Sequence, residues 1–238
     1  MEDRLKVKLF GLTEKEIKSK ISGALTSDTA EKIIINEQNL DACITIDIAD
    51  NVQSRIAARE ILTCFEQNIY SDRELTLAER LSDYLSLMNI KISVAESITG
   101  GLITSSLVSV PGISKYLIEG IVSYSNSSKH IRLNVSNEAL KETAVSEKAA
   151  AQMAEGLLLQ VDTDYAISAT GYASPDKDNP FLPVGLTYIG IADRNRTEVY
   201  KREFSGTRDE IRHKAANAAL FYLIKKLRAN FDPNDYDN

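Results

Sequence analysis

The sequence has few of the residues that build disulfide frameworks or zinc sites. It contains two cysteines and two histidines in 238 residues, with no C-x-x-C pair and no H-E-x-x-H motif. We therefore expect no dedicated metal site. Cys43 lies in an alternating, strand-like run and Cys64 in a helical pattern. Both positions favour packing roles in a reducing compartment over a disulfide.

Long apolar runs and an excess of positive charge are also missing. No stretch approaches the roughly 18 uninterrupted apolar residues of a membrane-spanning helix. The opening MEDRLKVKLFGL is charged where a signal peptide would be apolar. We predict a cytoplasmic protein that contacts no membrane. The net charge of −6 argues against a broad nucleic-acid surface, but it permits a local cationic pocket for an anionic metabolite.

The pattern of strands and helices predicts two domains, with a polar hinge at 69–73. Residues 1–70 indicate a small α+β domain, in which Thr13 and Glu16 form the capping box of the first helix. Residues 74–230 alternate strands with helices, which predicts a three-layer α/β/α domain with a mixed sheet. The expected strands of this second domain are 91–95, 119–124, 164–170, 184–192 and 198–204. Its expected helices are 75–88, 100–110, 145–160 and 207–228. We expect residues 231–238 to form a flexible tail.

One segment, AESITGG at 95–101, combines features of an anion or nucleophile site. It follows a predicted strand and opens a helix, which places Ser97 on a turn near free backbone N–H groups. Gly100 and Gly101 would let a ligand approach those groups closely. The alternative is that Ser97 or Thr99 only caps the helix while the glycines allow close packing. The residues alone leave both alternatives open.

A second segment, GIVSYSNSSK at 120–129, ends a strand at Tyr124 and carries Lys129 at the start of a helix. Both segments lie at the carboxyl ends of predicted strands, where open α/β sheets bind ligands. The simpler alternatives are a strand-end aromatic for Tyr124 and a solvated charge for Lys129.

Six blocks together resemble the C-terminal domain of CinA proteins, the nicotinamide mononucleotide deamidase. They are AESITGG, GIVSYSNSSK, AVSEKAA, ATGYASPD, PVG and GTRDEIR, in the family's order over residues 75–227. LFGLTEKEIKSKI and IYSDRELTLAERL resemble the KH-like unit that precedes this domain in full-length CinA. The molybdopterin-binding-like domain at the front of full-length CinA has no counterpart here, so we do not expect its metal-dependent pyrophosphatase activity.

The resemblance implies a serine–lysine amidohydrolase of pyridine nucleotide recycling, which converts nicotinamide mononucleotide to nicotinic acid mononucleotide and ammonia. Ser97 matches the nucleophile and Lys129 the base, while Tyr124 either relays the proton or orients the lysine. Backbone N–H groups around Thr99–Gly101 are expected to stabilise the oxyanion. The mechanism needs no metal and no organic cofactor. The expected substrate-binding residues are Glu96, Thr99, Gly100, Gly101, Asn126, Thr170, Gly171 and Arg208.

Two of these assignments carry alternatives. Glu96 binds a ribose hydroxyl or caps the turn. The substrate phosphate is bound by Arg208 and Arg212, one helical turn apart, or by backbone N–H groups at Thr170 and Gly171. For Arg212, a surface ion pair with Asp209 or Glu210 is the simpler interpretation.

The sequence also departs from the family pattern. Ile98 replaces a common cysteine and Thr143 a common glycine. Ser174 to Asp178 replace a GPDGG loop, and Leu182 replaces a lysine. The alternative function is therefore a catalytically inactive nucleotide-binding or scaffold protein. Nucleic-acid binding is not expected, because residues 1–70 lack the GXXG loop of KH modules. The resemblance implies a homo-oligomer, a dimer or larger.

Overall fold

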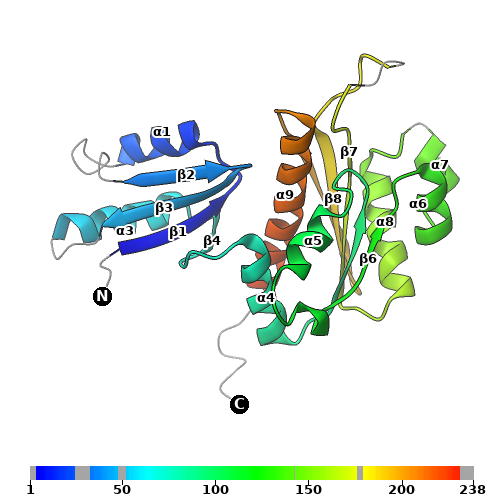
Figure 1. Ribbon diagram of the computed structural model, residues 1–238, viewed down its shortest axis with the longest axis horizontal. Coiled ribbons are helices and arrows are strands. Elements are labelled where there is room, and N and C mark those ends of the chain that lie inside the picture. Colours follow the sequence, from blue (N-terminus) through cyan, green and yellow to red (C-terminus); the bar gives the residue numbers. More distant parts are fainter. Residues whose placement is uncertain (1–3, 25–32, 48–51, 142, 176–178, 231–238) are drawn as a thin grey trace. The chain divides into compact units, whose positions relative to one another are not determined.

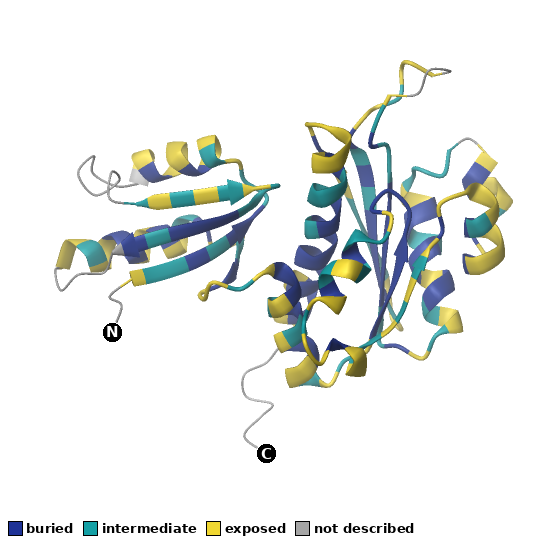
Figure 2. Cartoon of the chain, viewed as in Figure 1, coloured by how far each residue is buried: buried dark blue, intermediate teal, exposed yellow. Residues whose placement is uncertain are grey.

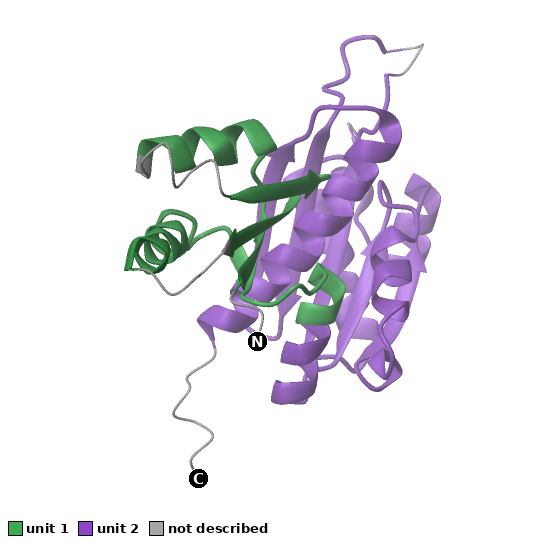
Figure 3. Cartoon of the chain, turned by 60° about the vertical axis from the view of Figure 1, so that its left-hand side comes forward, with its two compact units in different colours: residues 1–80 green, residues 81–238 purple. Residues whose placement is uncertain are grey.

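The computed structural model describes residues 4–24, 33–47, 52–141, 143–175 and 179–230. The chain divides into two compact units, Met1–Arg80 and Leu81–Asn238 (Figure 3). The predicted tail at 231–238 lies outside the described residues. Among the described helices, none combines the length and the apolarity that a bilayer crossing requires.

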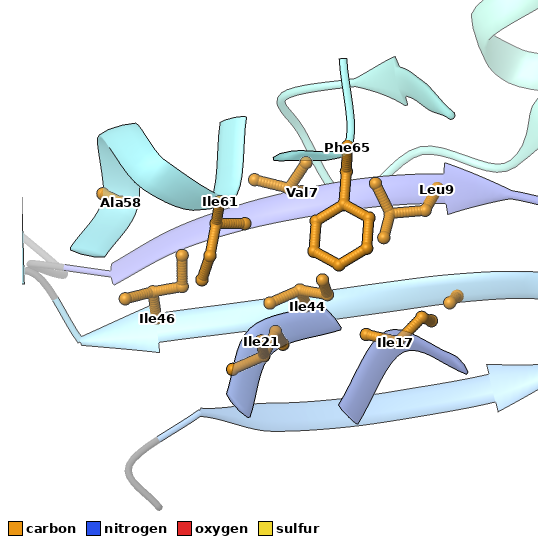
Figure 4. Packing of buried hydrophobic residues seen from close by; sticks show 10 residues of the cluster. Val7, Leu9, Ile17, Ile21, Ile44, Ile46, Ala58, Ile61 and Phe65 are labelled. Atoms are coloured by element: carbon orange, nitrogen blue, oxygen red, sulfur yellow. The ribbon is translucent and has the colours of Figure 1, made fainter. Parts of the chain in front are cut away.

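The first unit is a four-stranded antiparallel sheet with helices packed on it. In chain order its elements are β1 (Arg4–Phe10), α1 (Glu14–Ala24), β2 (Ile34–Gln38), β3 (Asp41–Asp47), α3 (Val52–Cys64) and β4 (Ile69–Ser71). The strand order is β2-β3-β1-β4. Alternate residues of β1 and β3 face α1 and α3 and form one apolar core, which includes Val7, Ile44 and Phe65 (Figure 4). The expected capping box is present, since the backbone N–H of Thr13 donates to the Glu16 carboxylate at 2.8 Å.

The hinge expected at 69–73 is wrong at its first residues, because Ile69–Ser71 forms strand β4 and pairs with β1. Tyr70 is buried, and its hydroxyl donates to the Asp41 carboxylate at 2.8 Å. Three residues are too few to show the strand period in the sequence, so only tertiary contacts reveal this strand. Helix α4 (Leu77–Met88) follows and spans the division between the units.

The second unit has the predicted mixed sheet. Its remaining elements are β5 (Ile92–Glu96), α5 (Leu102–Val108), the 3₁₀ turn η1 (Ile113–Lys115), β6 (Leu117–Val122), α6 (Asn126–Leu133), α7 (Asn137–Lys141), α8 (Glu147–Gln160), β7 (Tyr165–Gly171), β8 (Leu186–Asp193), β9 (Thr197–Glu203) and α9 (Arg208–Ala229). The strand order is β6-β5-β7-β8-β9. Strand β5 runs parallel to β6 and β7, and β8 is antiparallel to both β7 and β9.

Helices cover both faces of this sheet, which confirms the three-layer architecture (Figure 1). On one face α6, α7 and α8 pack against small residues such as Ala95, Ala166 and Ala192. On the other face lie α5 and the alanine-rich α9, whose inner residues are buried (Figure 2). Helices α8 and α9 begin at the expected residues, since Ser146 and Thr207 are their N-caps.

The parallel part of the sheet determines where the site forms. Strands β5, β6 and β7 all end at the same edge, because they run in the same direction. Ser97 follows β5, Ser123 and Tyr124 follow β6, and Thr170 lies at the end of β7. Three segments that are distant in the sequence therefore meet at one edge, where open α/β sheets place their ligands.

Candidate active site

Ser97 lies on the turn between β5 and α5 and is almost buried, with 7% of its surface exposed. Its backbone N–H donates to the Ala169 carbonyl at 2.9 Å, which ties the turn to β7. Gly100 and Gly101 have φ angles of 60° and 100°. This left-handed conformation is costly for residues with a side chain, so the glycine pair is needed to form the turn that follows Ser97.

Lys129 reaches Ser97 from the first turns of α6. Ser125 caps this helix by accepting the Ser128 N–H at 3.1 Å. The lysine side chain enters the protein, and only 2% of its surface is exposed. Its Nζ lies 2.9 Å from Ser97 Oγ. It also donates to two backbone carbonyls, of Ser123 at 2.9 Å and of Tyr124 at 3.2 Å. The structure thus brings together the two residues that the sequence could only place at neighbouring strand ends.

Burial lowers the pKa of Lys129 to about 8 from its ordinary value of 10.5. The cause is loss of hydration, which penalises the ammonium relative to the neutral amine. A neutral amine has two N–H donors and one lone pair. The two carbonyls can accept both N–H groups, which leaves the lone pair for the Ser97 hydroxyl. This arrangement suits a general base that takes a proton from serine.

A pocket of about 590 Å³ opens beside this pair. Seven of the predicted site residues line it, namely Ser97, Tyr124, Asn126, Lys129, Thr170, Gly171 and Arg208. The other described lining residues are Ile98, Ala144, Val145, Tyr172, Ala173, Ser174, Pro175 and Leu182. The volume lies within the ordinary range for small-molecule sites. The described lining residues include the cations Lys129 and Arg208 and no carboxylate, so this part of the pocket favours an anionic group.

Glu96 was expected to bind a ribose hydroxyl or to cap the turn, and its contacts are those of a cap. Glu96 is fully buried. Its carboxylate accepts backbone N–H groups from Gly101 at 2.8 Å, Ile103 at 3.2 Å and Thr104 at 2.9 Å. The Thr104 hydroxyl also donates to it at 2.6 Å. The carboxylate therefore occupies the start of α5, where the sequence predicted an external anion.

Three more of the residues expected to bind substrate do not line the described pocket, namely Thr99, Gly100 and Gly101. The Thr99 side chain is fully buried, and its hydroxyl has no hydrogen-bond partner in the described part of the chain. The Gly101 N–H is unavailable to an oxyanion because it donates to Glu96. The hydrogen bonds among described residues leave the N–H groups of Ile98, Thr99 and Gly100 without an acceptor, and of these three residues only Ile98 lines the described pocket.

Tyr124 orients Lys129 through its backbone carbonyl. Its side chain is 64% exposed, and its hydroxyl accepts a hydrogen bond from Arg208 Nη2 at 3.3 Å. Arg208 Nη1 donates to Ser174 Oγ at 2.8 Å. Of the two roles expected for Tyr124, the contacts support orientation of the lysine and show no proton relay. The contacts of Arg208 hold its guanidinium at the pocket, in a position to bind an anion.

The second arginine of the pair, Arg212, does not line the pocket. Its Nη2 donates to the Thr99 carbonyl at 3.0 Å, and its Nη1 pairs with Asp209 at 3.3 Å. The ion pair with Asp209 that the sequence suggested is therefore present. The contact with the turn after Ser97 is additional, and no sequence pattern indicated it.

Thr170 and Gly171 shape the pocket wall. The Thr170 hydroxyl donates to the Ala144 carbonyl at 2.8 Å, which ties the segment before α8 to the end of β7. A Cβ at Gly171 would lie 2.7 Å from the Leu186 carbonyl oxygen and 2.7 Å from Ile98 Cδ1, and the backbone contact leaves room only for glycine. The sequence missed Tyr172, whose hydroxyl contacts Thr143. A loop residue of this kind carries no periodic signal that could have identified it.

The fold and the site define an α/β protein with a buried serine–lysine pair at the carboxyl ends of the parallel strands in a mixed five-stranded sheet. The model of the CinA C-terminal domain matches residues 74–227. The chain belongs to the CinA family.

Relatives and solved structures agree with this membership. A Clostridium botulinum (strain Langeland) protein described as putative competence-damage inducible is 34% identical in a 229-residue alignment that covers 93% of this chain. The chain spans 56% of that relative's length. A CinA superfamily structure from Klebsiella pneumoniae 700603 superposes with a TM-score of 0.62 at 28% identity, covering 64% of this chain and 96% of that one. The structure of the competence/damage inducible protein CihA from Agrobacterium tumefaciens superposes with a TM-score of 0.58 at 32% sequence identity. This match covers 66% of this chain and 99% of that one.

Proposed function

We propose that the protein is an amidohydrolase that converts nicotinamide mononucleotide to nicotinic acid mononucleotide and ammonia. One observation carries the proposal. Ser97 Oγ and Lys129 Nζ lie 2.9 Å apart in a pocket, and burial lowers the pKa of the lysine to about 8. A serine hydroxyl is a weak nucleophile unless a nearby base removes its proton. The choice of substrate rests on the family resemblance.

The first half of the reaction forms an acyl-enzyme. Neutral Lys129 takes the hydroxyl proton while Ser97 Oγ bonds to the carboxamide carbon. We assign the oxyanion to the backbone N–H of Ile98, because Ile98 lines the pocket and its N–H has no acceptor among the described residues, whereas Gly101 donates to Glu96. The C–N bond then breaks, and the leaving nitrogen takes its proton from the Lys129 ammonium and departs as ammonia.

The second half releases the acid. Lys129, neutral again, takes a proton from water, and the resulting hydroxide attacks the acyl carbon. The C–O bond to Ser97 breaks, and Ser97 Oγ recovers a proton from Lys129. The pyridinium ring withdraws electrons from the carbonyl and so makes both attacks easier than in an ordinary amide.

Arg208 is the group we assign to the substrate phosphate. Its guanidinium lies at the pocket between Tyr124 and Ser174, and guanidinium groups bind phosphate oxygens with charge-assisted hydrogen bonds. Two aromatic residues, Tyr124 and Tyr172, line the same pocket. We assign them to the pyridinium ring, since aromatic faces attract cations.

The test is ammonia release from nicotinamide mononucleotide by the purified chain, measured beside Ser97→Ala, Lys129→Met and the exposed-serine control Ser105→Ala. We expect release by the parent chain and by the control, and none by the two site variants. Release that persists in Ser97→Ala would assign the chemistry elsewhere. Calorimetric binding of the nucleotide without ammonia release would favour the alternative, an inactive nucleotide-binding or scaffold protein.

A cytoplasmic location and a homo-oligomeric state stay predictions that follow from composition and resemblance. Light scattering on the purified chain tests the oligomeric state, and a monomeric mass would contradict it.

A further inference from the structure

We propose that Glu96 and Arg212 are positioning residues that hold the turn at 97–101 from two sides and so keep Ser97 Oγ in contact with Lys129. The inference deepens the proposed function, because it concerns the reactivity of the same serine. Neither residue lines the described pocket, so their effect must pass through the turn.

Glu96 holds the end of the turn from within the protein. A buried carboxylate is costly unless hydrogen bonds satisfy its oxygens. Glu96 accepts four hydrogen bonds, of which the 2.8 Å bond from the Gly101 N–H fixes the last residue of the turn. The N–H groups of Ile103 and Thr104 also donate to Glu96, which connects Glu96 to the first turn of α5.

Arg212 holds the middle of the turn from α9. Its Nη2 donates to the Thr99 carbonyl at 3.0 Å. A Cβ at Gly100 would lie 3.3 Å from the same nitrogen, so the missing side chain leaves room for the guanidinium. The Arg212 side chain is 26% exposed, and its other terminal nitrogen pairs at 3.3 Å with the exposed Asp209, a surface contact that contributes little. The arginine is therefore held against the turn and not extended into solvent.

The consequence concerns the serine, which lies between these fixed points and β5. Its N–H is bound to Ala169 at 2.9 Å, and the turn after it is held at Thr99 and Gly101. The hydroxyl is then aligned with Lys129 before substrate arrives. Displacements of about 1 Å can cost roughly 100-fold in rate, so loosening the turn should lower kcat and leave KM nearly unchanged.

The test uses paired variants of the full chain. Arg212→Met removes the bond to Thr99, whereas Asp209→Asn weakens only the ion pair. Thr104→Val removes one donor to Glu96, whereas Thr104→Ser keeps the hydroxyl. We expect about a tenfold or larger loss of kcat in Arg212→Met and Glu96→Gln and a smaller loss in Thr104→Val. KM should stay within about twofold, and Asp209→Asn and Thr104→Ser should match the parent. Melting curves verify that each variant is folded.

A second measurement does not depend on the substrate assignment. A fluorophosphonate probe labels activated serines, and its labelling rate at Ser97 should fall in the same variants. An unchanged kcat and labelling rate in Arg212→Met and Glu96→Gln would overturn the inference. So would a raised KM with an unchanged kcat in Arg212→Met, because that arginine would then bind substrate.

The two proposals fail in different ways. The parent chain could fail to hydrolyse nicotinamide mononucleotide while the labelling of Ser97 depends on Lys129 and slows in the variants. That result would support the positioning role and reject the proposed substrate. The absence of Lys129-dependent labelling would reject both.

Discussion

The low pKa of Lys129 makes a quantitative prediction about the pH dependence of activity. With a pKa of about 8, about 9% of the lysine is neutral at pH 7 and about 91% at pH 9. If neutral Lys129 is the base, kcat/KM should rise about tenfold between these two values and then level off. With the ordinary pKa of 10.5, only about 0.03% would be neutral at pH 7. Burial thus increases the active form about 300-fold at that pH.

The direction of the pH dependence follows from which protonation state of Lys129 burial penalises. The ammonium loses its hydration in the pocket, so the folded protein releases the proton at a lower pH than free lysine does. The neutral amine is the active form, so activity is lost as the pH falls through about 8. The phosphate of the substrate changes charge near pH 6, so measurements above pH 7 report on the enzyme.

The assay is the rate of nicotinic acid mononucleotide formation from pH 7 to pH 10, quantified directly by chromatography because coupling enzymes carry their own pH dependence. Lys129→Arg keeps a cation that cannot deprotonate and should be inactive throughout. Ser105→Ala should reproduce the parent profile. A rise centred at pH 10 or above, or activity that falls from pH 7 to pH 9, would refute the assignment of a buried neutral lysine as the base.

Two further predictions test the substrate contact and the packing that supports the site. Arg208→Met should raise KM for nicotinamide mononucleotide about tenfold or more, with little change in kcat, because it removes a charge-assisted contact worth about 1.5 to 3 kcal/mol. Initial-rate kinetics check this, and an unchanged KM would place the phosphate elsewhere. Gly156→Ala should destabilise the protein by about 1 to 3 kcal/mol, because a Cβ there would lie 1.8 Å from the Leu133 carbonyl at the end of α6. Gly23→Ala, with nothing within 4 Å, is the matched control in urea unfolding and should be neutral or slightly stabilising.

The order of strands and helices in the second unit was largely predictable, because its elements are long and have clear boundaries. Ser146 and Thr207 mark the starts of α8 and α9 by accepting N–H groups of the first turn. Short elements were not predictable. Helix α7 has five residues and β4 has three, too few to show a period, and tertiary contacts such as Tyr70 to Asp41 stabilise β4.

The sequence could place the candidate site residues at neighbouring strand ends, but it could not reveal the contacts that several of them make. Glu96 precedes Ser97 in the sequence, and its position alone cannot show which way the carboxylate points. In the structure it accepts N–H groups of the following turn and helix. Tyr124 contributes a backbone carbonyl to Lys129, and a side-chain motif cannot reveal a backbone acceptor. Arg212 contacts Thr99 across 113 positions of sequence, a separation at which local patterns carry no information.

A comparison of two buried lysines explains why we assign the role of general base to Lys129. Lys226 on α9 is also buried, at 4% exposed. Its Nζ forms ion pairs with two carboxylates, Asp193 at 2.8 Å and Glu198 at 2.9 Å. Lys129 donates instead to two neutral carbonyls and faces a serine hydroxyl. Uncharged acceptors satisfy its N–H groups without stabilising the positive charge as a carboxylate would, so burial can lower its pKa. Burial and uncharged partners together suit Lys129 to the role of base that we propose.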